Sequence, residues 1–124
     1  MMTATPGFHS VTPRMFVDDV AAQVEFLRAV FGADGELDGD RPVELRIGDS
    51  IVMVSNAAAR ERFPAFLYVY VDDTDATYER AVAAGASTEE GPLDTPYGDR
   101  RAMVRDPQGN VYQIATRIPD NDEQ

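Results

Sequence analysis

The sequence has no cysteine, and this absence excludes disulfide bonds, thiolate metal sites and a cysteine nucleophile together. A chain without cysteine fits a reducing compartment, so we expect a cytoplasmic protein. Histidine is almost as scarce. His9 is the single one, and one imidazole cannot build a typical two-histidine metal site. We interpret His9 as a surface or dimer-contact residue.

Long hydrophobic runs are also missing. No segment approaches the roughly 20 apolar residues that a membrane helix needs, so no membrane partner is expected. The N-terminal MMTATPGFHS has neither a basic region nor an apolar core, which argues against a secretion signal. With 44% apolar and 27% charged residues, the composition is typical of a globular protein rather than a disordered one.

Positive charge is in short supply. The chain has 11 basic and 22 acidic residues, for a formal net charge of −11. Such a field repels a phosphate backbone, so we expect no nucleic-acid partner. It would attract a cationic small ligand, although acidity can also serve solubility alone.

An internal repeat organises the rest. The motif FVDD at residues 16–19 returns as YVDD at residues 70–73, and the same offset relates Ala22 to Ala76, Glu25 to Glu79 and Ala29 to Ala83. The unit is too long for a solenoid repeat and indicates two copies of one module. The predicted parts are an N-terminal arm (1–10), a first module (11–56), a linker helix (57–64), a second module (65–117) and a disordered tail (118–124).

Each copy predicts a strand, a helix and three further strands. In the first, a strand over 11–17 precedes Asp18 or Asp19 as helix N-cap, and Gly32 ends the helix. Its remaining strands are expected near 36–38, 42–48 and 50–55. In the second, a strand over 66–71 precedes a helix that runs from Asp73 or Thr74 to about Ala84. Its remaining strands are expected near 86–89, 100–105 and 111–116.

The segment Asp-Pro-Gln-Gly-Asn at 106–110 predicts a tight hairpin between the last two strands. Two such βαβββ modules give an α+β fold, in which each helix covers one face of its sheet. The other faces would form the wall of a cupped, partly open mixed β-sheet.

The paired modules, the Val-Asp-Asp before each helix, the helix ends Phe-Gly-Ala and Ala-Gly-Ala, and the closing DPQGNVYQI together resemble the vicinal oxygen chelate superfamily. This superfamily contains glyoxalases, bleomycin resistance proteins and extradiol dioxygenases. The run YGDRRAMVRDPQGNVYQIATR looks like its glyoxalase-like, PhnB-like branch. The resemblance covers about residues 11–117, and it implies a ligand site inside the cup and a homodimer that often exchanges modules.

The resemblance also implies a metal site in many members, with histidines on the first strand of each module and a glutamate on the last. The corresponding positions here are Thr12, Met53, Phe66 and Gln113. None is a usual ligand for a divalent transition metal, apart from the weak amide oxygen of Gln113. We therefore predict no metal and no other cofactor.

Strand alternation predicts which side chains line the cup. The first strands would contribute Thr12, Arg14 and Phe16, and Phe66, Tyr68 and Tyr70. The later strands would contribute Ile51, Met53 and Ser55, Val111, Gln113 and Ala115, and Arg101, Met103 and Arg105. From this set the candidate ligand-binding residues are Thr12, Arg14, Phe16, Met53, Phe66, Tyr68, Tyr70, Arg101, Met103 and Gln113.

Aromatic side chains can stack on flat ligands or on cations. The alternative is that these side chains only fill the space between the sheets. The aspartate pairs at 18–19 and 72–73 could be acid–base carboxylates, but their place before helices favours capping. The run 97–101 could clamp an anion, but a turn with an exposed Arg–Asp pair is favoured over it.

Three functions stay open. The favoured one is a metal-free protein that binds or sequesters a small molecule, either a drug or a metabolite. The second is a lyase, isomerase or dioxygenase with an atypical or absent metal site, for which Tyr68, Tyr70 and Arg14 are the only acid–base candidates. The third is a structural or regulatory dimer without a small ligand. No nucleophile–base pair or phosphate-binding loop is present, so no catalytic residue is assigned.

Overall fold

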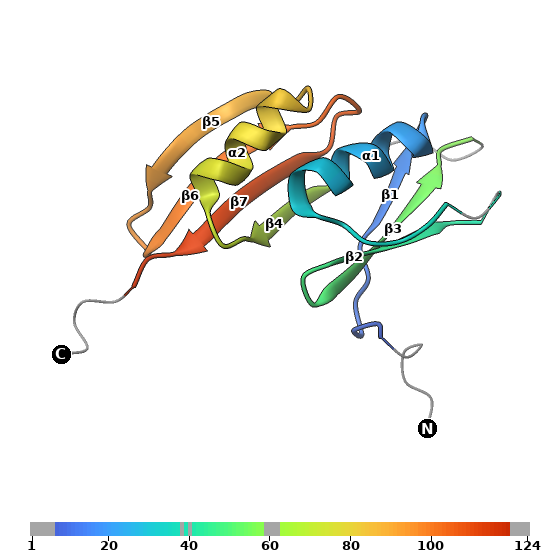
Figure 1. Ribbon diagram of the computed structural model, residues 1–124, viewed down its shortest axis with the longest axis horizontal. Helices are drawn as coiled ribbons and strands as arrows, with labels where there is room; N and C mark the ends of the chain where they lie inside the picture. The colour runs from blue at the N-terminus through green and yellow to red at the C-terminus, as the bar shows by residue number, and fades with distance from the viewer. Residues whose placement is uncertain (1–6, 38, 40, 59–62, 120–124) are drawn as a thin grey trace. The chain divides into compact units, whose positions relative to one another are not determined.

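The computed structural model describes residues 7–37, 39, 41–58 and 63–119. It divides into two compact units, Met1–Ala65 and Phe66–Gln124 (Figure 1). Within the described residues each unit has one helix and one open sheet, of three strands in the first unit and four in the second. The fold class is therefore α+β with two mixed sheets, as predicted. No helix in the described ranges is long and apolar enough to span a membrane.

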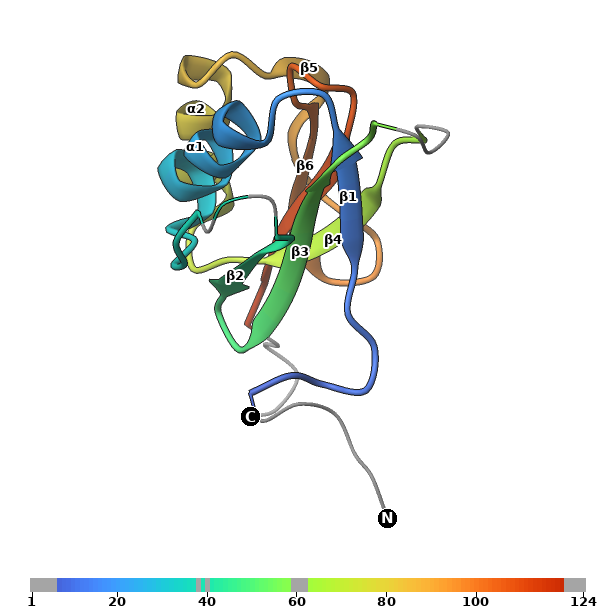
Figure 2. The ribbon, with the colours of Figure 1, turned by 90° about the vertical axis from the view of Figure 1, so that its right-hand side faces the viewer.

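The first unit contains β1 (Arg14–Val17), α1 (Val20–Phe31), β2 (Val43–Ile47) and β3 (Ser50–Asn56). Its sheet has the order β1-β3-β2, with β1 parallel and β2 antiparallel to β3. Figure 2 shows α1 lying against one side of these strands. The core between them holds Met15, Val17, Leu45, Val52, Val54, Val24, Leu27 and Val30, all at most 4% exposed.

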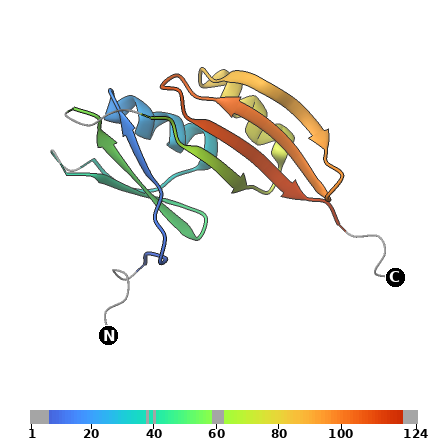
Figure 3. The same cartoon turned by 180° about the vertical axis from the view of Figure 1, so that it is seen from behind.

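The second unit contains β4 (Phe66–Tyr70), α2 (Thr74–Ala83), β5 (Ser87–Asp94), β6 (Asp99–Arg105) and β7 (Val111–Arg117). The strand order is β4-β7-β6-β5, with β4 parallel to β7 and the other pairs antiparallel. Seen from behind, this sheet lies in front of α2 (Figure 3). The face toward α2 buries Ala102, Val104, Tyr112 and Ile114.

Both helices begin at the second aspartate of the repeated motif. Asp19 has extended backbone angles, and its carboxylate accepts a hydrogen bond from the backbone N–H of Ala22 at 3.0 Å. Asp73 does the same for Ala76 at 3.1 Å. Each carboxylate satisfies a backbone donor that has no partner inside the helix, so the capping interpretation is confirmed.

The turn between β6 and β7 is held by a buried carboxylate. Asp106 is 3% exposed, and its Oδ1 accepts the backbone N–H groups of Gln108 and Asn110 at 2.9 and 3.0 Å. Its Oδ2 accepts the hydroxyl of Tyr112 at 2.7 Å. Because Asp106 joins the turn to a core side chain, it sets the register of the strands on either side.

The first module departs from the predicted pattern. No strand forms at Glu36 and Leu37, and residue 38 lies outside the described residues. Instead Asp34 makes a single antiparallel bridge to Arg46. At the next residue, Gly35, an added Cβ would lie 2.3 Å from the carbonyl oxygen of Glu44. The backbones come too close there for a side chain to fit.

The strand ends also differ. The first strand begins at Arg14 rather than at residue 11, because Pro13 has no N–H to donate to a ladder. The linker helix predicted over 57–64 falls at 59–62 outside the described residues. The same holds for most of the N-terminal arm and for the tail beyond Pro119, so these parts stay predictions.

Candidate functional site

Three strands of the second sheet place the predicted residues in rows. Tyr68 pairs with Gln113 of β7, which pairs in turn with Met103 of β6. The neighbouring rows are Phe66, Val111 and Arg105, and Tyr70, Ala115 and Arg101. On β6 and β7 the residues between them in sequence are buried on the side of α2, so these rows form the opposite face of the sheet.

Aromatic rings gather on this face and remain exposed. The exposed fractions are 62% for Phe66, 39% for Tyr68, 62% for Tyr70 and 53% for Tyr97. The rings of Tyr68 and Tyr70 lie 5.4 Å apart, tilted by 60°. We call these four residues the aromatic face. Neighbouring exposed aromatic side chains are typical of a binding surface, whereas scattered ones are not.

A buried carboxylate lies beneath the aromatic face. Asp99 begins β6 and is 1% exposed. Its Oδ2 accepts the hydroxyls of Tyr68 at 2.6 Å and Tyr70 at 2.8 Å, and a guanidinium nitrogen of Arg117 lies 3.4 Å from Oδ1. The hydrogen bond from Tyr68, together with those from Tyr70 and Arg117, lowers the pKa of Asp99, while desolvation opposes them.

The two tyrosines respond in the opposite sense. Desolvation of the Tyr68 hydroxyl is the first cause that raises its pKa far above the ordinary value, and the hydrogen bond to Asp99 is the second. The hydrogen bond to the same carboxylate raises the pKa of Tyr70. Both phenols therefore keep their protons at neutral pH. A phenol that keeps its proton is a poor general base, so the raised pKa values count against that role for Tyr68 and Tyr70.

The turn between β5 and β6 adds Tyr97 to this network. The hydroxyl oxygens of Tyr97 and Tyr68 lie 3.3 Å apart, and Arg101 donates to the Tyr97 oxygen at 2.8 Å. A second nitrogen of Arg101 pairs with Glu90 at 2.5 Å. Since Tyr68 has a single hydroxyl proton, which it gives to Asp99, Tyr97 is the donor in its contact with Tyr68. The result is a directed chain from Arg101 to Asp99.

Gly98 and Arg117 hold the turn in place. Gly98 has a φ of 98°, and an added Cβ would lie 2.8 Å from a guanidinium nitrogen of Arg117. The same nitrogen donates to the carbonyl oxygen of Tyr97 at 2.8 Å. The left-handed backbone favours glycine at this position, and any larger residue would also displace the Arg117 guanidinium.

Sequence analysis missed most of this network. The run 97–101 was interpreted as a turn with an exposed Arg–Asp pair, and that is wrong for Asp99, which is buried and paired with Arg117. Arg100 instead pairs with Asp75 and Asp94 on the other side. The available signal was the period of two, which places residues 99, 101 and 103 on one face of a strand.

The first unit also has an open face. Arg14 lies with its guanidinium carbon 5.0 Å from the ring centroid of Phe16 and donates to Ser55 at 2.9 Å. Met53 pairs with Arg14 in the ladder and is half-buried. Thr12 precedes β1 and lies outside the sheet. Whether any of the ten predicted residues binds a ligand stays a prediction.

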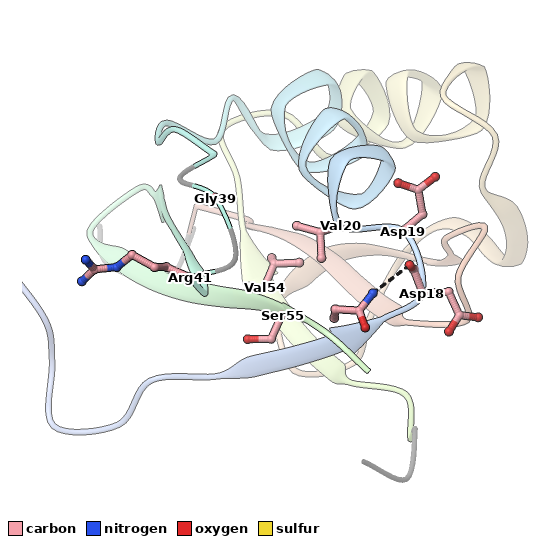
Figure 4. Close-up of a pocket in the computed structure, with 8 residues that line it drawn as sticks. Asp18, Asp19, Val20, Gly39, Arg41, Val54 and Ser55 are labelled. Atoms are coloured by element: carbon pink, nitrogen blue, oxygen red, sulfur yellow. Dashed lines mark hydrogen bonds between the residues drawn. The ribbon is translucent and has the colours of Figure 1, made fainter. Parts of the chain in front are cut away.

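A separate pocket of about 600 Å³ lies in the first unit, where β1 and β3 end and α1 begins (Figure 4). Asn56 donates to the backbone oxygen of Asp18 at 3.1 Å across one side of it. Figure 4 shows Arg41 pointing away from Asp18 and Asp19. The lining residues are Asp18, Asp19, Val20, Gly39, Arg41, Val54, Ser55 and Asn56, none of which was among the predicted ligand-binding residues.

The four positions that correspond to metal ligands do not form a metal site. Phe66 has no lone pair, Met53 offers only a thioether, and Thr12 lies outside the sheet, which leaves the amide of Gln113. In the described part of the chain, no three His, Cys, Asp or Glu side chains are grouped so as to hold a metal ion. The donor set does not fit a divalent transition metal.

Comparison with known proteins identifies the class. The model of the Glyoxalase/Bleomycin resistance protein/Dioxygenase superfamily matches residues 7–114. The chain therefore belongs to this superfamily, as the sequence motifs predicted. Its place in the PhnB-like branch stays a prediction.

Three relatives give the range of similarity. TioX from Micromonospora sp. ML1 superposes with a TM-score of 0.76 at 27% identity, over 87% of this chain and 98% of that one. The anthracycline biosynthesis protein DnrV of Streptomyces peucetius is 34% identical over 108 residues, 81% of this chain and 38% of DnrV. An uncharacterized protein of Mycobacterium bovis is 27% identical over 88% of this chain and 84% of its own length.

Proposed function

We propose that this protein binds and sequesters a small, flat, aromatic molecule, and that it does so on the aromatic face without a metal. The observation that carries the proposal is a group of four exposed aromatic side chains, of which Tyr68 and Tyr70 donate to one buried carboxylate and Tyr97 contacts Tyr68. A ligand that covers these neighbouring exposed rings lowers the free energy, because it removes apolar surface from water.

The hydrogen-bond network prepares the aromatic face for a ligand. Tyr68 and Tyr70 are held at their hydroxyl ends by Asp99, and Tyr97 is held by Arg101. Side chains that are already ordered lose little conformational entropy when a ligand stacks on them. Flat aromatic ligands suit such rings because offset or tilted stacking adds to the burial of area.

The similarities support a ligand of this kind. DnrV carries the name of an anthracycline biosynthesis protein, and the superfamily carries the name of bleomycin resistance. Anthracyclines contain a fused planar ring system, which matches the aromatic face in chemistry. Fold alone does not carry function, so this analogy supports the proposal and does not replace the geometry.

An enzyme is the competing proposal, and two observations count against it. A metal-dependent lyase, isomerase or dioxygenase would need a group of metal ligands, and the described residues show none. A metal-free enzyme would need a base near the ligand, and the raised pKa values count against Tyr68 and Tyr70 in that role. The hydrogen bonds with Tyr68 and Arg101 lower the pKa of Tyr97, which leaves Tyr97 as the phenol to test as a base. We also propose a cytoplasmic homodimer, on the resemblance and the lack of cysteine, to be checked by light scattering coupled to size-exclusion chromatography.

The test is a binding titration with an anthracycline and a panel of flat aromatic and peptide antibiotics. Phe66→Ala is expected to weaken anthracycline binding at least about tenfold, because a buried aromatic contact contributes about 1.5–3 kcal/mol. Phe63→Ala is the matched control, since Phe63 is 65% exposed and lies outside the aromatic face. Absence of saturable binding across the panel, or equal loss in both variants, would contradict the proposal.

A further inference from the structure

The geometry points to a narrower ligand class, an inference that rests on the proposed function. The aromatic face selects aromatic molecules that carry a hydrogen-bond donor, such as an amino or ammonium group. It discriminates against flat molecules that offer only acceptors or a negative charge. The reason lies in where each hydroxyl proton of the tyrosine cluster (Tyr68, Tyr70 and Tyr97) goes.

Every phenolic proton in the cluster is already used. Tyr68 and Tyr70 both donate to Oδ2 of Asp99, at 2.6 and 2.8 Å. Tyr97 donates to Tyr68, because the only proton of Tyr68 is directed to the carboxylate. A hydroxyl has one proton to give, so none of the three can donate to a ligand without breaking a bond to its present partner.

The phenolic oxygens, by contrast, still have lone pairs. Tyr70 receives no hydrogen bond from the residues that the structure describes, and 62% of its surface is exposed. Tyr97 accepts from Arg101 and is 53% exposed. A hydroxyl that donates to an ionised carboxylate becomes a stronger acceptor, since chained hydrogen bonds polarise one another. The tyrosine cluster therefore presents acceptors to a ligand.

The arginines around the aromatic face already pair with carboxylates, although 64% of the Arg117 side chain and 44% of the Arg105 side chain stay exposed. Arg101 pairs with Glu90 at 2.5 Å, Arg105 with Glu89 at 2.9 Å, and Arg117 lies 3.4 Å from Asp99. The Nε of Arg101 has no partner in the described part of the chain, but it is buried beyond the reach of a ligand. An anion would also meet the field of a protein with a formal charge of −11.

Two fluorescent probes of similar shape test the inference. One is 9-aminoacridine, a planar tricyclic cation with N–H donors at neutral pH, and the other is anthracene-9-carboxylate, a planar tricyclic anion without donors. The expected result is that the first binds at least about tenfold more tightly. Equal affinities, both reduced by Phe66→Ala, would overturn the ligand class and leave the proposed function standing. Failure of both probes to bind would overturn both.

A substitution separates the acceptor from overall charge attraction. Tyr70→Phe removes one acceptor oxygen and keeps the ring and the net charge. It is expected to weaken binding of 9-aminoacridine about five- to tenfold and to leave anthracene-9-carboxylate unchanged. The matched control is Tyr78→Phe, because the Tyr78 hydroxyl bonds to Thr88, outside the cluster. Unchanged binding of 9-aminoacridine in Tyr70→Phe would overturn the inference.

Asp99→Asn tests the proton account together with the loss of the carboxylate charge. An asparagine amide can donate to one of the two tyrosine oxygens, which frees that hydroxyl to donate to a ligand. The variant is therefore expected to narrow the difference in affinity between the two probes at least about threefold, through tighter binding of anthracene-9-carboxylate. A difference that stays the same in a folded Asp99→Asn protein would contradict the assignment of the protons.

Discussion

At the scale of single residues, the two buried aspartates Asp99 and Asp106 of the second unit accept hydrogen bonds from different kinds of groups. Asp106 holds the backbone of a turn and the hydroxyl of Tyr112, so its partners all belong to the fold. Asp99 holds the hydroxyls of exposed rings, so its partners belong to a surface. A buried carboxylate that orients exposed aromatic groups is the arrangement on which the proposed function rests.

The pH dependence of stability follows from the pKa of Asp99. Its folded-state value lies below the unfolded value of about 4, first because Tyr68 donates to the carboxylate. Its contribution to stability is therefore present above that pH and is lost as the pH falls through the folded-state pKa. Melting temperatures of wild type and Asp99→Asn, measured from about pH 7 to pH 2, are expected to converge only in acid. A constant gap would contradict this assignment.

At the scale of secondary-structure elements, the predicted helix starts were confirmed, whereas one predicted strand was wrong. The helices begin where the capping aspartates predicted, because an N-cap interacts with backbone atoms only three residues away. The strand expected near 36–38 does not form at Glu36 and Leu37, because its pairing depends on a distant segment. There Asp34 makes a single bridge to Arg46 instead of a ladder.

The close approach at Gly35 predicts that Gly35→Ala destabilises the protein by about 2 kcal/mol or more, since its Cβ would overlap a backbone oxygen that cannot rotate away. Gly91→Ala is the matched control, because an added Cβ there meets no atom within 4 Å and the backbone is not left-handed. Urea unfolding of the two variants measures the difference. A Gly35→Ala midpoint equal to that of Gly91→Ala would show that the backbones separate without cost.

At the scale of the whole molecule, the chain belongs to a superfamily whose implied metal-ligand positions carry an unusual set of side chains here. The family match spans residues 7–114, yet the residues at the metal-ligand positions supply no adequate donor set. The open sheets remain, and the second one carries the aromatic face. A scaffold that positions ligands for a metal can bind ligands without one, because the shape of the sheet does not depend on the ion.

Metal content tests this assignment for the complete protein. Tag-free protein, dialysed and examined by elemental analysis, is expected to contain far less than one equivalent of zinc, nickel, manganese or iron per chain. The reason is that Thr12, Met53, Phe66 and Gln113 cannot compete with water and buffer for these ions. About one ion per chain would show that the positions were aligned wrongly, and the enzyme alternative would then lead.

The sequence alone predicted the α+β class, a repeated module, the helix caps to within one residue and the alternation that placed Phe66, Tyr68 and Tyr70 on one face of a strand. These features depend on residues a few positions apart, and the period of a helix or strand converts that spacing into geometry. Only the tertiary structure decided that Asp99 is buried beneath those rings and that a strand of the first module is replaced by a bridge. Burial and hydrogen bonding arise where distant parts of the chain meet, and no local pattern encodes which groups will share a proton.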